Sequence, residues 1–363
     1  MKIEIEKQAA KKLAGDINSM LSGYRASMKF MEVCGTHTMA IHSSGIKSLF
    51  SSKLVLVSGP GCPVCVTEKL FIDQAIFLGK NFGACLVTFG DLVRVPGTEG
   101  SLADLRSQGG SVKVVYSPMD VIAIAAQVAP QPAVFLGVGF ETTIPTVAVT
   151  LKAALSQNVK NLFVLPAFKT IHRPLKILAS QKDLSGFLLP GHVSAIIGAN
   201  SYDYLPRDYH KPGVIAGFDG LDILLAIRGL VEMTVNGEAK IKNEYRTVVK
   251  PEGNVVARTL IDEVFEPADA SWRGLGVIQG SGLKLRSPYD SFDALKRFPI
   301  EVLASPDDPR CKCARILTGE LTPNQCGLFG RECVPEAPVG PCMVSSEGTC
   351  AAYYKYGGGT LDT

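Results

Sequence analysis

Residues 28–38 read Met-Lys-Phe-Met-Glu-Val-Cys-Gly-Thr-His-Thr, a short, largely apolar run that ends at a glycine among polar residues. The run Met28–Val33 is typical of a β-strand, and the residues from Cys34 predict a loop that leaves this strand. The Cys34 thiol and the His37 imidazole can reach one point in space. Together they could ligate iron or zinc, or form a nucleophile–base pair. The alternative is a buried cysteine beside a histidine in a turn.

The same unit of strand, polar turn and helix-like stretch recurs along the chain. A first set of predicted strands covers Met28–Val33, Lys53–Ser58, Ala84–Phe89 and Val112–Tyr116, and a second set covers Ala133–Val138, Asn161–Leu165, Gly186–Leu189 and Gly213–Ala216. Strands that alternate with helices indicate βαβ units and parallel sheets. We therefore expect an α/β fold in which two similar parallel-sheet domains face a cleft.

The predicted domain organisation follows from these two sets of strands. Residues 1–27 alternate charged and apolar side chains and predict an N-terminal amphipathic helix. Residues 28–129 form the expected first α/β domain, and residues 130–236 form the second. The Pro-rich stretch Ala129-Pro130-Gln131-Pro132 marks the boundary between them.

A different C-terminal domain is expected over residues 237–363. The strand-like region 240–250 departs from the preceding rhythm, and from about residue 285 Pro, Gly and Cys dominate. This tail has few periodic apolar residues for a conventional core. We therefore predict that a metal cluster holds it together.

The overall composition is that of a globular protein. Of 363 residues, 46% are hydrophobic and 20% are charged, with a net charge of +3. This near-neutral balance gives no reason to expect nucleic acid or an anionic membrane as a partner. The apolar region 121–140 is interrupted by Gln and Pro, and the N-terminus lacks the apolar core of a signal peptide. We expect a cytoplasmic protein.

The ten cysteines need an explanation, because structural disulfides are disfavoured in the cytosol. Four lie at positions 34, 62, 65 and 85, and six lie between 311 and 350. This distribution favours metal binding or thiol redox chemistry. Cys85 lies inside an apolar run and is expected in the core.

A Cys-x-x-Cys motif, Gly59-Pro60-Gly61-Cys62-Pro63-Val64-Cys65, follows the second predicted strand. The next residues look helical, so the motif lies near a helix N-terminus, where thiolate is favoured and the cysteine pKa falls. This placement is typical of a reversible dithiol. The alternative is structural zinc held by Cys34, His37, Cys62 and Cys65. Both loops are expected to leave the carboxyl ends of strands in one sheet, where α/β folds place their sites.

Three further loops carry polar groups in the same structural position, and one of them, Gly217-Phe218-Asp219-Gly220, follows the last predicted strand. Glu141 follows a strand in Gly137-Val138-Gly139-Phe140-Glu141-Thr142-Thr143, and His192 follows another in Leu189-Pro190-Gly191-His192-Val193. Both could face the cysteines of the first domain across the cleft. The alternative is that the two threonines cap a helix and His192 is an ordinary loop histidine.

The tail cysteines predict an iron–sulfur cluster, with zinc as the competing metal. They are Cys311, Cys313, Cys326, Cys333, Cys342 and Cys350. Because a cluster needs four ligands, two are left over. We favour Cys326, Cys333, Cys342 and Cys350 as ligands, with Cys311 and Cys313 as a nearby dithiol or as alternative ligands.

Five motifs together resemble the HypD family of [NiFe]-hydrogenase maturation factors, in the right order and over nearly the whole chain. They are Met31–Thr38, Gly59–Val66, Gly139–Thr143, Pro190–Val193 and Pro341–Tyr354. The first, second and last are long and specific. Thr349 departs from the family pattern, where a smaller residue is expected, and this puts little in doubt.

The resemblance implies an assembly factor rather than a conventional turnover enzyme. It implies that Cys34 binds iron together with a thiolate of a small chaperone, HypC, and that His37 lies close by. It implies that Cys62 and Cys65 are a redox pair supplied with electrons by a [4Fe-4S] cluster in the tail. Two cyanides, brought by HypE, and one carbon monoxide are attached, and the Fe(CN)2CO unit passes to the hydrogenase large subunit.

Two other functions remain open on the sequence. One is a thiol oxidoreductase resembling ferredoxin–thioredoxin reductase, in which cluster and dithiol reduce a protein disulfide and Cys34 holds no metal. The other is a non-catalytic protein with structural zinc at both cysteine groups.

Overall fold

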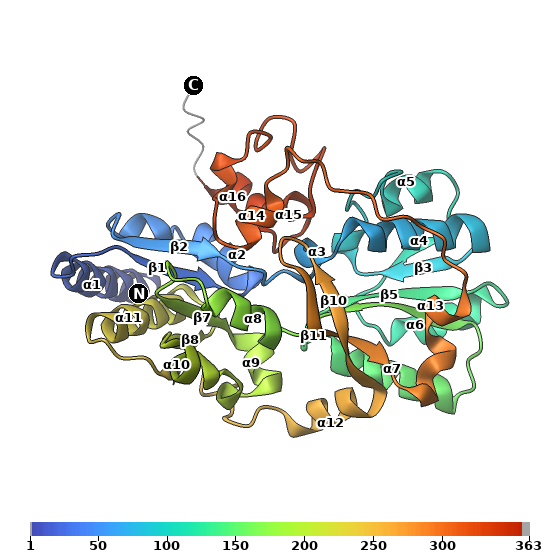
Figure 1. Cartoon of the computed structure of the whole chain (residues 1–363), viewed down its shortest axis with the longest axis horizontal. Coiled ribbons are helices and arrows are strands. Elements are labelled where there is room, and N and C mark those ends of the chain that lie inside the picture. The colour runs from blue at the N-terminus through green and yellow to red at the C-terminus, as the bar shows by residue number, and fades with distance from the viewer. Residues whose placement is uncertain (1, 358–363) are drawn as a thin grey trace.

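Two parallel β-sheets organise the computed structural model, which describes the backbone of residues 2–357 and the side chains of residues 7–357 (Figure 1). Sheet A has five strands in the order β2 (Leu54–Ser58), β1 (Met28–Glu32), β7 (Gly186–Pro190), β8 (Gly213–Ala216) and β9 (Ile241–Asn243). Sheet B has four strands in the order β4 (Val112–Val114), β3 (Cys85–Thr88), β5 (Ala133–Gly139) and β6 (Leu162–Phe168). All pairings in both sheets are parallel. The predicted α/β class and all eight predicted strands are confirmed.

The predicted grouping of these strands is wrong. A division into residues 28–129 and 130–236 puts β1 to β4 in one sheet, but β1 pairs with β7 and β3 pairs with β5. The chain leaves sheet A after β2, builds all of sheet B, and returns to sheet A after β6. Apolar runs of this kind predict strands, but they do not determine which buried strand becomes the neighbour, because every candidate has a similar apolar surface.

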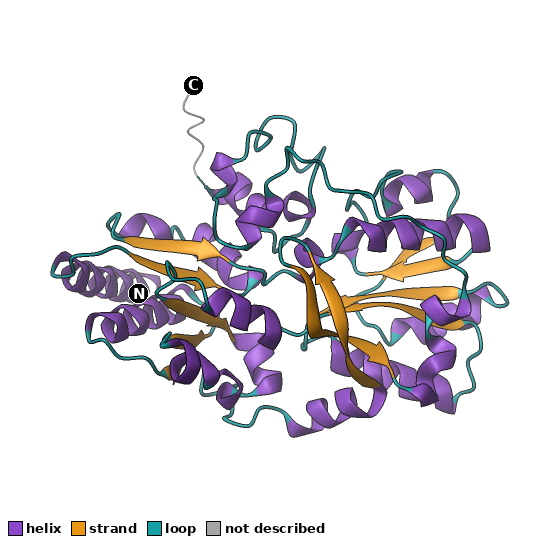
Figure 2. Cartoon of the chain, viewed as in Figure 1, coloured by secondary structure: helices purple, strands orange, loops and turns teal. Residues whose placement is uncertain are grey.

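Helices cover both faces of each sheet (Figure 2). The α-helices are α1 (Lys2–Ser22), α2 (Gly35–Ser43), α3 (Pro63–Val66), α4 (Lys69–Phe82), α5 (Leu102–Ser107), α6 (Asp120–Val128), α7 (Ile144–Ser156), α8 (His172–Ala179), α9 (Gly191–Ile197), α10 (Tyr204–Tyr209), α11 (Gly220–Val235), α12 (Val255–Val264), α13 (Ala294–Arg297), α14 (Cys313–Leu317), α15 (Pro341–Val344) and α16 (Thr349–Tyr356). The 3-10 helices are η1 (Ile46–Leu49), η2 (Gly90–Leu92), η3 (Ala199–Tyr202), η4 (Ser287–Phe292) and η5 (Pro323–Gln325).

Successive residues of a strand face opposite sides of the sheet and pack against different layers of helices. In β3, Cys85 and Val87 pack with α6 and α7, whereas Leu86 packs with α4 and α5. In sheet A, α1 and α11 cover one face, where Ile17 and Leu21 of α1 are fully buried one helical turn apart. The N-terminal helix is therefore confirmed, apart from Met1, which lies outside the described residues.

The expected separate C-terminal domain over residues 237–363 is not confirmed. β9 extends sheet A, and the antiparallel hairpin of β10 (Phe265–Trp272) and β11 (Gly276–Leu285) packs against β6 and α8. The last helices pack instead on the site loops, α16 against α2 and α15 against α3. Because this C-terminal region contributes to three separate parts of the fold, its sequence gives no single periodic pattern.

Side chains from both sheets and from the tail meet in one continuous buried cluster, where the sequence analysis predicts a cleft. This cluster includes the sulfur atoms of Cys62, Cys65 and several tail cysteines. The functional candidates therefore lie in the core at the junction of the two sheets. Within residues 2–357, no helix is both long and apolar enough to cross a lipid bilayer.

Candidate functional site

The loops that carry Cys34 and Cys62 meet because β1 and β2 are parallel neighbours. The Gly35 amide donates to the Gly61 carbonyl at 3.3 Å. A Cβ atom at Gly61 would lie 2.4 Å from the Cys34 amide nitrogen, so this approach requires glycine. The expectation that both loops leave the carboxyl ends of strands in one sheet is confirmed.

Cys34 is the N-cap residue of α2 and is 9% exposed. Burial, and then the charge of Glu347, raise the pKa of its thiol to about 11, although hydrogen bonds from His37 and Thr36 act in the opposite direction. Glu347 accepts a hydrogen bond from the Thr36 hydroxyl, which fixes the carboxylate there. The Cys34 thiol therefore keeps its proton at neutral pH, and a metal that binds it has to displace that proton.

His37 is fully buried and neutral. Its Nε2 lies 2.9 Å from the Gly217 carbonyl oxygen, which assigns the ring proton to Nε2 because a carbonyl only accepts. Burial lowers the pKa of the imidazole to about 4. Within the described residues Nδ1 has no hydrogen-bond partner. The main chain of His37 thus lies at the Cys34 sulfur, while its ring is anchored to the loop after β8.

The two cysteines of the dithiol differ in acidity. Cys62 caps α3, and its sulfur accepts from the Cys65 amide at 3.2 Å. Burial raises the pKa of the Cys62 thiol well above its usual value. Burial acts on Cys65 in the same sense, but hydrogen bonds with Cys342 and Cys62 and the charge of Arg273 lower the pKa of Cys65 to about 5. The thiolate of the pair is therefore Cys65, whereas the expected lowering at the helix N-terminus does not extend to Cys62.

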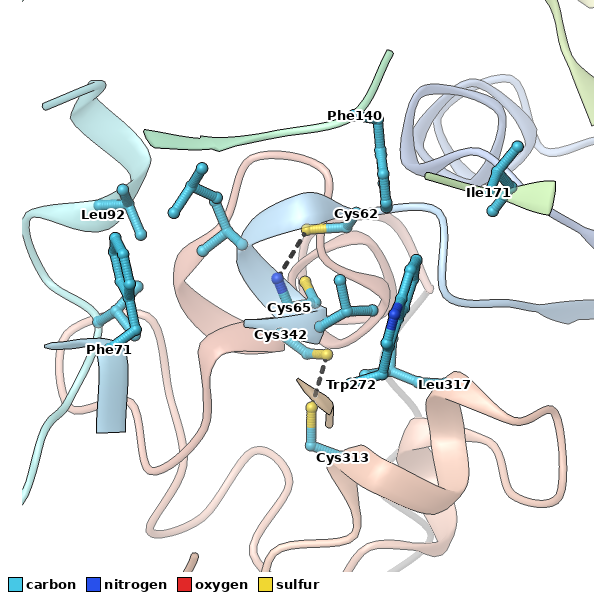
Figure 3. Packing of buried hydrophobic residues seen from close by; sticks show 14 of the residues in the cluster. Cys62, Cys65, Phe71, Leu92, Phe140, Ile171, Trp272, Cys313, Leu317 and Cys342 are labelled. Carbon is cyan, nitrogen blue, oxygen red and sulfur yellow. Dashed lines mark hydrogen bonds between the residues drawn. The ribbon is translucent and has the colours of Figure 1, made fainter. Parts of the chain in front are cut away.

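A chain of sulfur atoms joins the dithiol to the tail (Figure 3). Cys65 hydrogen-bonds with Cys342, and the Cys342 sulfur lies 2.7 Å from the sulfur of Cys313. All ten cysteines are free thiols. The structure thus places Cys342 at the contact between the two cysteine groups that the sequence analysis treated separately.

All six tail cysteines line one small cavity: Cys311, Cys313, Cys326, Cys333, Cys342 and Cys350. The other lining residues are apolar or glycine, including Ile316 and Leu328. A Cβ atom at Gly340 would lie 2.8 Å from the Cys311 sulfur, so the lack of a side chain at this glycine leaves room for that thiol. A set of thiols around an apolar cavity has the donor chemistry of an iron–sulfur cluster. In the described part of the chain no three His, Cys, Asp or Glu side chains converge tightly enough to hold a single metal ion.

Glu141 and His192 do not join the sulfur atoms. Glu141 is buried, its Oε1 accepts from the Ile171 amide at 2.9 Å, and burial raises the pKa of its carboxyl to about 7. His192 is exposed at the start of α9 and stacks on Phe218 at 4.0 Å between ring centroids. Phe218 also contacts the ring of His37. The alternative of a threonine cap fails at Thr143, which makes no side-chain capping bond at α7.

Three polar side chains at the sulfur atoms escaped the sequence analysis. Glu347 faces Cys34, and Arg273 faces Cys65. Asp91 accepts a hydrogen bond from Ser345, which lies beside Cys62. Glu347 and Ser345 lie inside the Pro341–Tyr354 motif, which could have indicated them. Asp91 and Arg273 follow strands far away in sequence, and no local pattern connects them to the cysteines.

Comparisons with known proteins agree on one family. Residues 8–357 match the family model described as "HypD: Hydrogenase formation hypA family". The chain is 42% identical over 332 residues to the hydrogenase maturation factor HypD of Escherichia coli, covering 91% of this chain and 89% of that protein. It is 40% identical to HypD1 of Bradyrhizobium diazoefficiens, covering 97% and 95% of the two chains. It is 38% identical to HypD of Rhizobium leguminosarum, covering 96% and 93%.

Proposed function

Because the chain belongs to the HypD family of hydrogenase formation proteins, we propose that it acts in hydrogenase maturation as a redox-active scaffold. In this role it holds iron together with the chaperone HypC while the Fe(CN)2CO unit is assembled. HypE supplies cyanide, and the finished unit passes to the hydrogenase large subunit. The observation that carries the proposal is the meeting of Cys34, the Cys62–Cys65 dithiol and the tail cysteines at the junction of the two sheets.

Cys34 is the proposed iron ligand of this chain. Iron that accepts two cyanides and one carbon monoxide needs open coordination positions, so one thiolate from this chain and one from a partner suit it better than a closed set of four protein ligands. The neutral His37 lies three positions after Cys34, and within the described residues its Nδ1 has no hydrogen-bond partner. The single thiolate ligand from this chain and the neutral state of His37 support a substrate iron that is bound loosely and later released.

The dithiol is the proposed source of reducing equivalents at the iron. Cys65 is a thiolate at neutral pH, and it touches Cys342. A [4Fe-4S] cluster in the tail cavity would supply single electrons to these thiols. The sulfur contacts support an electron path from the tail to Cys65.

The contacts favour a revised ligand set for this cluster. Because Cys342 pairs with Cys313 at 2.7 Å and also touches Cys65, these two thiols are better used as a second redox pair. The remaining four tail cysteines line the same cavity and are our proposed cluster ligands: Cys311, Cys326, Cys333 and Cys350. This set replaces Cys342 with Cys311 in the choice made from sequence.

Two alternatives make different predictions. A thiol oxidoreductase that resembles ferredoxin–thioredoxin reductase uses the same sulfur chain and would reduce a disulfide substrate without any iron at Cys34. A structural zinc protein would be colourless and would contain zinc without sulfide.

Anaerobic purification, alone and with the chaperone, tests the proposal through absorption spectra, iron, sulfide and zinc analysis, and infrared spectra. The assembly role predicts about four irons and four sulfides in the isolated chain. The complex should hold additional iron and show CN and CO bands. Zinc without sulfide, together with no infrared bands, would refute the proposal.

Cys62→Ser or Cys65→Ser should fold normally but stop maturation, and active hydrogenase in cells that carry either variant would refute the redox role.

A further inference from the structure

A chain of hydrogen bonds leads from the Cys62 thiol to the carboxylate of Asp91. The thiol donates to the Ser345 hydroxyl oxygen at 3.3 Å, and that hydroxyl donates to Asp91 Oδ2 at 2.9 Å. Cys62 and Ser345 are buried, whereas Asp91 is partly exposed. The chain thus connects a buried sulfur to solvent.

The direction of this chain is fixed by what Ser345 can donate and accept. A serine hydroxyl has one proton to donate and two lone pairs. The Ser345 oxygen accepts from Cys62 and from the Glu347 amide at 3.2 Å, so both lone pairs are used. Its single proton therefore points to Asp91. Ser346 also donates to Asp91 Oδ2, from its amide at 2.9 Å and from its hydroxyl at 2.8 Å, which fixes the carboxylate in place.

We propose that Asp91 accepts, through Ser345, the proton that Cys62 loses when the Cys62–Cys65 dithiol closes to a disulfide. This inference rests on the redox role of the dithiol proposed above. Asp91 follows β3 of sheet B, Cys62 follows β2 of sheet A, and Ser345 belongs to the tail. The three parts of the fold each contribute one residue to the relay.

The chemical step balances with a disulfide, RS–SR, as the oxidant. The Cys65 thiolate attacks one sulfur of RS–SR, forms a mixed disulfide and releases RS⁻. Cys62 then gives its proton to Ser345 while Ser345 gives its own to Asp91. The Cys62 thiolate attacks the Cys65 sulfur, forms the internal disulfide and releases the second RS⁻. The dithiol loses two electrons, the oxidant gains them, and Asp91 returns its proton to solvent.

A purely electrostatic role of Asp91 predicts the opposite effect. The groups that face the relay are Cys65 of α3 and Glu347 of the tail, and Arg273 in turn faces Cys65. The negative charge of Asp91 disfavours the thiolate of Cys65 and the ionised form of Glu347. If Asp91 acted only as a charge, Asp91→Asn would make the thiols easier to deprotonate and would speed disulfide formation. The relay predicts slower closure.

The test measures closure of the disulfide in the full-length protein. The reduced protein is mixed with glutathione disulfide at neutral pH and quenched in acid at set times. Free thiols are then alkylated under denaturing conditions. Trypsin cleaves after Lys53 and Lys69, and Cys62 and Cys65 are the two cysteines of the resulting peptide Leu54–Lys69. Mass spectrometry separates the dithiol, the glutathione adduct and the internal disulfide.

In Asp91→Asn we expect the glutathione adduct to persist roughly tenfold longer or more, while its formation is unchanged, because only the second attack needs the base. Ser345→Ala breaks the chain at its middle and should behave in the same way. The matched control is Asp120→Asn, an exposed aspartate on α6 that should leave both steps as in the wild type. Raising the pH should remove the difference, because hydroxide then deprotonates Cys62 directly.

The outcomes separate the relay from the function it rests on. An adduct that resolves at the wild-type rate or faster in both variants would overturn the relay and leave the redox role intact. A wild-type protein that forms the glutathione adduct at Cys65 but never forms the internal disulfide would overturn the redox role itself. Thermal melting of each variant establishes that it is folded, and Ser345→Ala carries the test if Asp91→Asn does not fold.

Discussion

Cys34 and Cys65 are both buried, yet the pKa values of their thiols lie near 11 and near 5. Burial raises both, so the difference comes from neighbours. Glu347 places a negative charge beside Cys34, whereas Cys65 has two thiol hydrogen bonds and faces the cation of Arg273. In the proposed role, Cys34 would bind metal as a protonated thiol that releases its proton, and Cys65 would act as the nucleophilic thiolate of the dithiol.

Cys34→Ala is expected to abolish partner-dependent iron binding without loss of the tail cluster. The reason is that Cys34 is the proposed thiolate of this chain at the iron, and it lies outside the tail cavity. Iron and sulfide are measured in the complex with the chaperone. Cys85→Ala, in the core of sheet B, serves as the control and should retain the iron. Full iron content in the Cys34→Ala complex would contradict the assignment.

Glu141 predicts a specific pH dependence of stability. Burial raises the pKa of its carboxyl from 4.5 to about 7 in the folded chain. The folded state therefore binds this proton more tightly than the unfolded state. The stabilisation is complete below pH 4.5, is lost as the pH rises toward 7, and is absent above that. The difference amounts to roughly 3 kcal/mol.

The Glu141→Gln variant should lose this pH dependence, because an amide accepts the Ile171 hydrogen bond without titrating. Urea unfolding of both proteins is compared between pH 5 and pH 8. The free energy of unfolding of the wild type should fall with pH relative to that of the variant. Parallel curves would show that Glu141 does not titrate in this range.

At the scale of elements, the site depends on how closely two strand-to-helix loops approach. A side chain at Gly61 would collide with the main chain of Cys34, which cannot move as a flexible side chain can. We expect Gly61→Ala to destabilise the fold by about 3 kcal/mol, the upper part of the range for overpacking. The measurement is urea unfolding.

Gly15→Ala is the matched control for this prediction. Gly15 lies inside α1 with no atom near its ideal Cβ position. There alanine should stabilise the helix by about 0.5–1 kcal/mol. The same substitution should therefore have opposite signs at the two sites, and an unchanged stability of Gly61→Ala would show that the loops can separate.

The elements themselves were largely predictable, because each one carries its own signal. The eight strands coincide with short apolar runs, and β8 matches its predicted range. β9 was included in a region assigned to another domain, because three residues at a sheet edge are too short to show a pattern. For the site, the motifs identified Cys34, Cys62 and Cys65. They did not identify Asp91 or Arg273, which reach the sulfur atoms only through tertiary folding.

At the scale of the whole molecule, the order of strands in space differs from their order in sequence. Sheet B is built from one continuous stretch, residues 85–168, whereas sheet A combines strands that precede this stretch with strands that follow it. The sequence favours the arrangement that is not observed, because strands that follow each other in the chain are usually neighbours. The pairings of β1 with β7 and of β3 with β5 distinguish the two arrangements.

This topology predicts which fragments fold. Residues 1–129 contain two of the five strands of sheet A and two of the four strands of sheet B, and this fragment should show no cooperative thermal transition. Residues 67–183 contain every strand of sheet B with α4 to α8 and should retain helical structure and melt cooperatively. Circular dichroism of the two fragments measures this. A cooperative transition in residues 1–129 would contradict the observed pairing.

The return of the chain to sheet A determines the order in which the paired strands are synthesised during translation. β1 carries Cys34 toward its place, but its partner β7 is made only after all of sheet B, since Phe30 pairs with Gly186. At ordinary ribosomal rates this interval is about 10–30 s. Ser345 and Glu347 leave the ribosome later still. The cysteines of the first two loops are therefore synthesised early and remain without their final surroundings until nearly the whole chain exists. If Cys34 holds iron as proposed, a nascent chain offers no finished site for it, and loading would be confined to completed molecules.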